Sequence, residues 1–120
     1  MSVEPKRLKP KKGPEAILQE QIEKFLEARG WIVKSTHGGM FQAGFPDLWI
    51  THKNHGGRWV EVKLPNMEGS RWTDAQREWF PILTANGTPI WIMTRTTEQE
   101  YRILFDQPNG NFLEYFMLKG

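Results

Sequence analysis

The stretch GFPDLWITHKNHGGRWVEVKL, residues 44–64, decides the fold expected for this chain. It contains two apolar runs, residues 48–51 and 58–64, separated by Asn54-His55-Gly56-Gly57. Two apolar runs joined by such residues are typical of strands connected by a tight reversal. The stretch therefore predicts a β-hairpin with its turn near His55.

Three ionisable residues converge on this hairpin. Alternate side chains of a strand lie on one face, so Glu61 and Lys63 emerge together while the apolar residues between them face a core. A turn near His55 makes Asp47 the direct or diagonal neighbour of Glu61, close enough for both carboxylates to hold one divalent cation. The backbone carbonyl of Val62 would complete the ligands, and Lys63 would lie beside the attacking water or the developing charge.

A Glu-x-Lys triplet by itself is also typical of a solvated ion pair on a strand. The Pro46-Asp47 element before the turn favours the catalytic interpretation, because it adds a second acid at the same point. Asp47, Glu61 and Lys63 are therefore the predicted catalytic set for metal-dependent cutting of nucleic acid.

At this point the sequence resembles a known family. The stretches Gly44-Phe45-Pro46-Asp47-Leu48, Val60-Glu61-Val62-Lys63 and Thr73-Asp74-Ala75-Gln76 are similar to the PD-(D/E)XK nuclease pattern in its virus-type replication-repair form, the VRR-NUC domain. The resemblance implies an α/β, restriction-endonuclease-like fold with a mixed central sheet flanked by helices. It also implies Mg²⁺ or Mn²⁺ as cofactor and hydrolysis of phosphodiester bonds in DNA, often branched DNA such as Holliday junctions.

A helix expected over residues 15–29 contains a further candidate acid. Pro14 suits a first helical position, and the apolar stripe of the helix comprises Leu18, Ile22, Phe25 and Leu26. At about 100° per residue, Glu15 faces inward with this stripe, Gln19 lies near its edge and Glu20 faces water. The Glu15-x-x-x-Gln19 spacing also resembles the helix motif of the family, which implies that Glu15 binds the metal directly or through water. The alternative is that Glu15 only complements the positive end of the helix.

Gln76 has two competing interpretations. Thr73-Asp74-Ala75-Gln76 fits a capping box, which explains the glutamine structurally. The resemblance implies instead that Gln76 assists at the active site, where its amide would orient the scissile phosphate or water, and a helix N-terminus can serve both purposes.

Charge and composition predict one intracellular domain with a basic tail. The net charge of +2 divides into +4 for residues 1–12 and −2 for the remainder. Residues 1–13 are therefore expected to be a flexible tail and residues 14–120 the nuclease domain. Lys9, Lys11 and Lys12 are candidate phosphate contacts, the alternative being a solubilising terminus or an expression scar. The absence of cysteine and of long apolar runs favours a cytoplasmic protein, bacterial or of a phage-infected host, with no membrane partner.

The remaining pattern predicts strands at residues 31–35, 48–52, 58–64 and 89–94, and a helix at 74–85 in which Pro81 causes a kink or an irregular turn. Beyond residue 96 a helix and a hairpin through Pro108-Asn109-Gly110 are both compatible with the pattern, and the hairpin is preferred.

Two loops, residues 37–44 and 66–72, are expected to frame the substrate. Gln19 on the helix, His37 in the first loop, and Arg71 and Trp72 in the second are candidate DNA contacts, although Trp72 could simply cover a core edge. The other tryptophans are interpreted as packing residues, and His52 and His55 lack partner ligands for a metal site.

The predicted protein is thus a Mg²⁺- or Mn²⁺-dependent DNA endonuclease acting on branched duplex, with no small-molecule substrate. Cutting two strands implies a homodimer, for which Phe112, Tyr115 and Phe116 would supply an apolar patch. The alternatives are a non-catalytic DNA-binding module on the same fold and a nuclease directed at flaps, ends or RNA.

Overall fold

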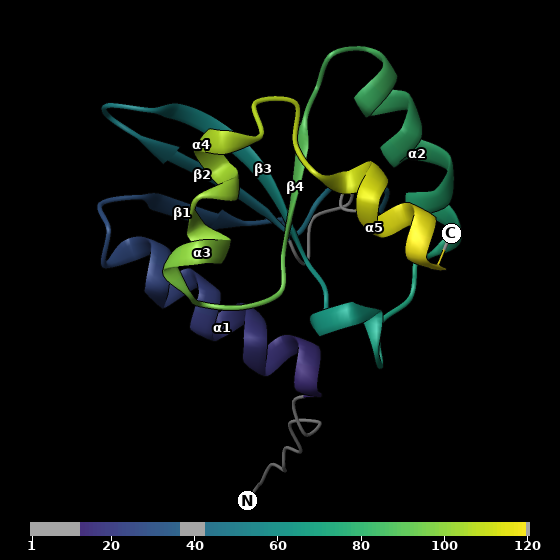
Figure 1. The fold of residues 1–120 in the computed structure, drawn as a ribbon, viewed down its shortest axis with the longest axis horizontal. Coiled ribbons are helices and arrows are strands. Elements are labelled where there is room, and N and C mark those ends of the chain that lie inside the picture. The colour runs from purple at the N-terminus through teal and green to yellow at the C-terminus, as the bar shows by residue number, and fades with distance from the viewer. Residues whose placement is uncertain (1–12, 37–42, 120) are drawn as a thin grey trace, which may run out of the picture.

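A four-stranded mixed sheet forms the centre of the computed structural model, which describes residues 13–36 and 43–119 (Figure 1). The strands lie in sequence order, the first three antiparallel and the last parallel to its neighbour. They are β1 (Ile32–Ser35), β2 (Leu48–His52), β3 (Gly56–Val62) and β4 (Ile90–Met93). This sheet with its flanking helices confirms the predicted α/β, restriction-endonuclease-like architecture.

Helix α1 (Pro14–Glu27) forms as the sequence predicts. Proline occupies its first turn, where the missing N–H costs nothing. Ile22 and Leu26 are fully buried against the sheet, and Leu18 and Phe25 pack beside them. The helix ends two residues earlier than expected, and Gly30 with a φ of 90° reverses the chain toward β1.

The hairpin of β2 and β3 turns where predicted. The His55 amide donates to the His52 carbonyl at 3.1 Å, and the register pairs Leu48 with Val60. This register places Asp47, the residue before β2, directly across from Glu61.

Helix α2 (Asp74–Ala85) begins with a complete capping box and continues through Pro81 as one helix. No irregular turn interrupts the helix at Pro81, and the predicted kink there stays a prediction. Proline removes one backbone hydrogen bond there, and the neighbouring Phe80, which is fully buried, anchors the same turn to the core.

The chain after β4 corrects one prediction, because it forms helices and not a hairpin. These are α3 (Glu98–Tyr101), α4 (Ile103–Asp106) and α5 (Phe112–Lys119). Asn111 explains the difference: its amide oxygen accepts from the Ile92 amide at 2.6 Å, and its amide nitrogen donates to the Ile92 carbonyl at 3.2 Å. A side chain thus occupies the edge of β4 that a further strand would need.

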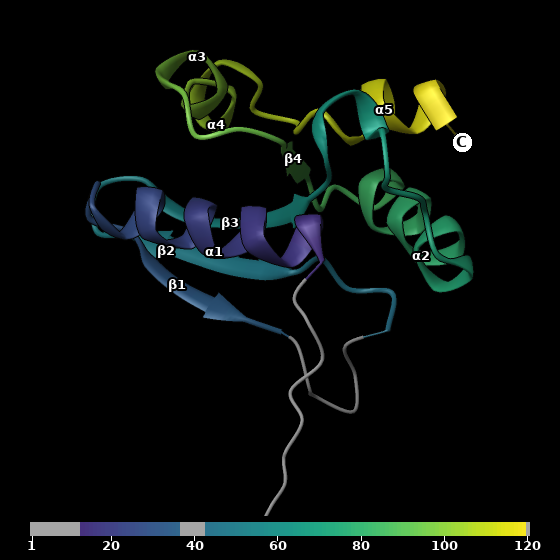
Figure 2. The same ribbon diagram turned by 90° about the horizontal axis from the view of Figure 1, so that it is seen from below.

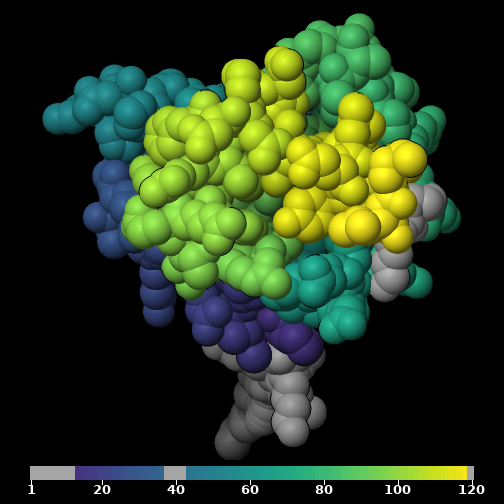
Figure 3. Space-filling view, in the orientation of Figure 1, coloured from purple at the N-terminus to yellow at the C-terminus, as the bar shows by residue number. Residues whose placement is uncertain are grey.

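Two clusters of buried residues pack against the two faces of the sheet. The first joins α1 and the α3–α4 segment to the face carrying Leu48, Ile50, Val60 and Val62. The second joins α2 and α5 to the opposite face of β4 through Ile90, Ile92, Phe80 and Phe112. Figure 2 shows α3 and α4 on one side of the layer formed by β1, β2 and β3. Figure 3 shows the C-terminal segment covering the near side of the molecule. Phe112 is only 2% exposed, so it cannot supply the predicted dimer patch.

Candidate active site

Two buried carboxylates meet where β2 begins and β3 ends. The Asp47 amide donates to Glu61 Oε1 at 3.0 Å, and the Val62 amide donates to Asp47 Oδ2 at 2.9 Å. Asp47 is 8% exposed and Glu61 is 1% exposed. The expected proximity of the two acids is thereby confirmed, and reciprocal backbone bonds hold each carboxylate beside the other.

This pair is electrostatically costly without a cation. Burial raises the pKa of Glu61 well above its ordinary value of 4.5, and the nearby charge of Asp47 raises that pKa further. Lys63 acts in the opposite direction and lowers it. Two acids thus lie side by side in a buried site, and this donor set suits a bound cation.

Lys63 lies on the same face of β3 as Glu61, as the strand alternation predicts. Its Nζ donates to the Arg71 carbonyl at 2.8 Å and to Gln76 Oε1 at 3.1 Å, and lies 3.3 Å from Glu61 Oε2. The ammonium also lies 4.6 Å from the ring centroid of Trp72. Although Lys63 is 2% exposed, its charge is therefore balanced by three oxygen acceptors and an aromatic face.

Gln76 forms the predicted capping box and also contacts two of the predicted catalytic residues. Its Oε1 accepts from the Thr73 amide at 3.1 Å, which completes the capping box, and the same oxygen accepts from Lys63 Nζ. Its Nε2 donates to Glu61 Oε2 at 2.9 Å. The capping geometry orients the amide so that its two ends contact the two charged residues on β3.

Glu15 reaches the site from the first turn of α1. It is half-buried, Glu20 is exposed, and Ser70 Oγ donates to Glu15 Oε2. Ser70 in turn accepts from the Leu64 amide at 2.8 Å, so it joins α1 to the chain that leaves β3. The intervening turn η1 (Pro65–Met67) is compact, with Met67 fully buried at a φ of 64°.

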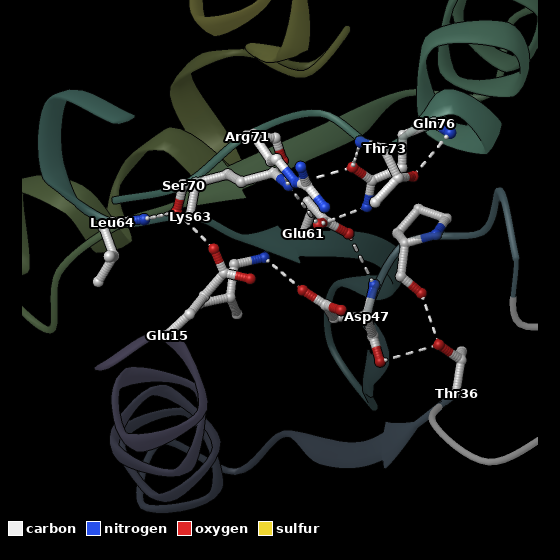
Figure 4. A network of polar contacts seen from close by, with 12 residues as sticks. Glu15, Thr36, Asp47, Glu61, Lys63, Leu64, Ser70, Arg71, Thr73 and Gln76 are labelled. Carbon is white, nitrogen blue, oxygen red and sulfur yellow. Dashed lines mark hydrogen bonds and ion pairs between the residues drawn. The ribbon is translucent and has the colours of Figure 1, made fainter. Parts of the chain in front are cut away.

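These residues line one cavity of about 450 Å³ (Figure 4). Asp47, Glu61, Lys63, Glu15 and Gln76 all contribute to its wall, so the structure brings together every residue predicted to be catalytic. The exposed Arg71 lies at the same cavity, where its guanidinium is available to a phosphate.

Two other predicted DNA contacts, Trp72 and Gln19, are not part of the cavity lining. Trp72 is 3% exposed and packs edge-on against Phe80 and Phe112, so the packing alternative is correct and its ring cannot stack on a base. Gln19 lies outside the cavity lining and donates to Glu23 at 2.9 Å. Lys9, Lys11, Lys12 and His37 lie outside the described residues.

Two contributors were missed at the level of sequence. Ser70 holds Glu15, and Thr73 both caps α2 and lines the cavity. The capping pattern did predict Thr73 as the helix cap, but not its place in the cavity wall. Ser70 had no comparable signal, because a serine in a loop acquires its role only when the η1 turn places it under α1.

The histidine pair belongs to an aromatic cluster. The rings of His52 and His55 lie 4.5 Å apart between their centroids, and His55 stacks on Trp31 at 5.8 Å. His52 Nδ1 already accepts from the Asn54 amide at 3.0 Å. These contacts account for both imidazoles as packing groups.

The donor set of the cavity suits a hard divalent cation with two carboxylates. Within residues 13–36 and 43–119, no three His, Cys, Asp or Glu side chains are grouped closely enough to form a metal cluster. The role of Glu15 as a metal ligand, direct or through water, stays a prediction, with its carboxylate held by Ser70 at the same cavity. The N–H and C=O of one strand residue point to the same strand edge, so the Val62 carbonyl emerges on the side where its amide meets Asp47.

No helix in the described part of the chain has the length and apolar character needed to cross a bilayer.

Comparison with known proteins agrees with this geometry. The family model described as the VRR-NUC domain matches residues 8–95, which include the cavity residues from Glu15 to Gln76. Searches of curated proteins and of solved structures found no match to the chain. The match covers well over half of the sequence and contains all three motif stretches. The chain therefore belongs to the VRR-NUC family of nucleases, which act on DNA and generally use divalent metals.

Proposed function

We propose that this protein is a Mg²⁺- or Mn²⁺-dependent DNA endonuclease that selects branched DNA in the manner of a Holliday-junction resolvase. The observation that carries the proposal is the reciprocal bonding of Asp47 and Glu61 next to the Lys63 ammonium, at the wall of one cavity. A structural ion pair would need one acid for one lysine. The second buried acid favours a site built for a divalent cation.

The ligands would be one carboxylate oxygen from each of Asp47 and Glu61, together with the Val62 carbonyl. A divalent cation at this position supplies Lewis-acid polarisation of a phosphate oxygen and acidifies water. Glu15, held by Ser70, would order water at the opposite wall of the cavity.

Lys63 would stabilise the negative charge that develops on the phosphate, or orient the attacking water. Gln76 would keep Lys63 and Glu61 in place through its two amide atoms, and Arg71 would contact a neighbouring phosphate at the rim. Buried, fully bonded side chains lose little entropy when substrate arrives, which favours a preorganised site.

Cleavage of a panel of labelled DNAs tests the proposal. The panel contains a four-way junction, a flap, a linear duplex and single strands, each incubated with magnesium, manganese or EDTA. Asp47→Ala and Lys63→Ala are the test variants, and Asp106→Ala and Lys53→Ala, at exposed positions outside the cavity, are the matched controls.

We expect metal-dependent cutting of the junction that both test variants abolish and both controls retain. Binding without cleavage under every metal would instead identify a non-catalytic DNA-binding module. Preferential cutting of the flap or of single strands would retain the chemistry and replace the resolvase assignment.

A homodimer follows from the need to cut two strands. The exposed apolar side chains of α5, Leu113, Met117 and Leu118, replace the buried Phe112 as its candidate contact. Light scattering coupled to size exclusion, with and without junction DNA, checks this point, and a monomer under both conditions would exclude a dimeric resolvase.

A further inference from the structure

An aromatic surface lies on the same sheet face as the two catalytic acids. Trp49 follows Asp47 by two residues, and Trp59 precedes Glu61 by two, so strand alternation places all four on one face. The register pairs Trp49 directly with Trp59, and the Asp47–Glu61 pair is the next on that face. Two strand residues span about 7 Å, so the indoles adjoin the candidate metal ligands.

The indoles form a continuous platform with Phe45. Ring centroids of Trp49 and Trp59 lie 4.9 Å apart, and those of Phe45 and Trp59 lie 6.0 Å apart. Trp49 is 37% exposed and Phe45 is 42% exposed, an unusual exposure for large aromatic rings. We call Phe45, Trp49 and Trp59 the aromatic platform.

Gly57 lets the Trp49 indole lie against the sheet. A Cβ built on Gly57 would come within 2.2 Å of Trp49 Cζ2 and 2.3 Å of Cη2. The six-membered ring therefore covers the position that a side chain would occupy, and no other residue type at 57 would allow this placement without displacing the ring. The Trp49 indole is thus held against the sheet while part of its surface stays accessible, at 37% exposure.

The surroundings of the platform favour a polyanion with flat rings. Lys34 is exposed and pairs directly with Trp49 in the register of β1 and β2, which adds a cation to the same row. Beside the indoles lies a second cavity of about 260 Å³, lined by Trp49, Gly57, Trp59 and Pro89 among others. Exposed aromatic faces next to a cation are the combination that stacks unpaired bases while contacting their phosphates.

We propose that the aromatic platform stacks unpaired nucleotides adjacent to the phosphate that is cut. The stacked bases would be those left unpaired at a branch point, whether in an opened four-way junction or beside a flap. This inference rests on the proposed nuclease function for the position of the cut, but the stacking itself can be measured without cleavage.

Equilibrium binding by fluorescence anisotropy tests the proposal, with calcium replacing magnesium. One probe is a duplex with a short single-stranded flap carrying 2-aminopurine beside the branch, and the other is a fully paired duplex of equal length. Trp49→Ala removes the platform ring, and Trp49→Phe restores a smaller stacking ring. Phe105→Ala is the control, because Phe105 is also 37% exposed but packs with Trp31 and His55 in the other aromatic cluster.

We expect Trp49→Ala to weaken flap binding by about 5- to 150-fold, the range for loss of one stacked base, while duplex binding changes little. Trp49→Phe should recover most of the loss, Phe105→Ala should bind like the wild type, and quenching of 2-aminopurine should disappear only in Trp49→Ala. Equal weakening for both probes, or no weakening, would overturn the proposal. So would conversion of a dimer to a monomer by Trp49→Ala, since the platform would then be an interface between copies.

The two proposals fail separately. Selective loss of flap binding by Trp49→Ala, combined with no cleavage of any probe by the wild type in magnesium or manganese, would support stacking and exclude the nuclease function. Cleavage by the wild type with unchanged flap binding by Trp49→Ala would support the nuclease and exclude stacking.

Discussion

At the scale of single residues, substitution of Gln76 distinguishes its helix-capping contact from its contacts to Glu61 and Lys63. Gln76→Glu retains an oxygen that can accept from the Thr73 amide, so the helix cap survives, but it cannot donate to Glu61. We expect cleavage to fall about 10-fold or more, as for other groups that orient metal ligands. The new carboxylate would also lie beside the buried Glu61, so the unfolding free energy in EDTA should fall near neutral pH although the cap is retained. The measurement is the cleavage rate against metal concentration, beside denaturant unfolding.

Thr73→Ala is the complementary substitution. It removes the acceptor of the Gln76 amide while leaving the contacts of Gln76 to Glu61 and Lys63. Stability should fall by about 1 kcal/mol, and cleavage should change less than in Gln76→Glu. Parallel losses of stability and activity in both variants would contradict the division of roles.

Asp47→Asn tests how much the repulsion between the Asp47 and Glu61 carboxylates destabilises the metal-free protein. Because burial and Asp47 raise the pKa of Glu61, the folded metal-free protein is favoured when Glu61 is protonated, and that advantage is lost as pH rises from 4.5 through the raised pKa. The substituted amide can still accept from the Val62 N–H but carries no charge. In EDTA the variant should therefore have a higher Tm than the wild type near neutral pH, with the difference shrinking toward pH 4.5.

The measurement is the Tm of both proteins by thermal unfolding in EDTA, from pH 4.5 to neutral pH. Added magnesium should raise the Tm of the wild type and not that of Asp47→Asn, since one ligand charge is gone. A variant less stable than the metal-free wild type at every pH would show that the pair is not under repulsion.

At the scale of elements, Asn111 determines how the C-terminal segment attaches to the sheet. Its side-chain amide bonds both backbone groups of Ile92 and is 4% exposed. Asn111→Ala would leave a buried donor and a buried acceptor on β4 unpaired, which should cost about 2–4 kcal/mol. The exposed Asn109→Ala is the control and should be close to neutral by chemical denaturation. A similar effect of both substitutions would disprove this attachment.

The same contact explains which elements could be predicted. Strands 48–52 and 58–64 and helices near 15–29 and 74–85 have local patterns strong enough to determine them. Helices α3, α4 and α5 form after β4, although a turn-like Pro108-Asn109-Gly110 favours a hairpin. The deciding interaction joins Asn111 to a residue 19 positions away, so no local pattern could report it.

At the scale of the whole molecule, the charge asymmetry predicts how DNA binding depends on salt. Residues 1–12 carry +4 on a chain whose remainder carries −2. If Lys9, Lys11 and Lys12 contact phosphates, neutralising all three should reduce the slope of log K against log salt by about 2–3. Anisotropy titrations of duplex DNA across salt concentrations provide the measurement. Substitution of Lys53, Lys24 and Arg102 serves as a charge-matched control, and an equal reduction there would indicate a nonspecific charge effect.

The sequence by itself determined which residues share the candidate catalytic face. Strand alternation requires Glu61 and Lys63 to share a side, and the Asn-His-Gly-Gly turn sets the register that brings Asp47 to Glu61. These are local constraints of covalent geometry and hydrogen bonding, so they are visible in a run of twenty residues. The helical period likewise turned Glu15 toward the site.

Only the tertiary structure decided how that face is completed. Ser70 contacts Glu15, which lies 55 positions away in the chain, and Gln76 bridges Glu61 and Lys63. Trp72 is buried in the core and does not lie on the predicted DNA surface. The Trp49 and Trp59 indoles became a surface because α2 and α5 pack over β4, and because Gly57 leaves room for a ring. Which face of a strand stays open depends on packing between distant elements, and the pattern of a single strand contains no record of that packing.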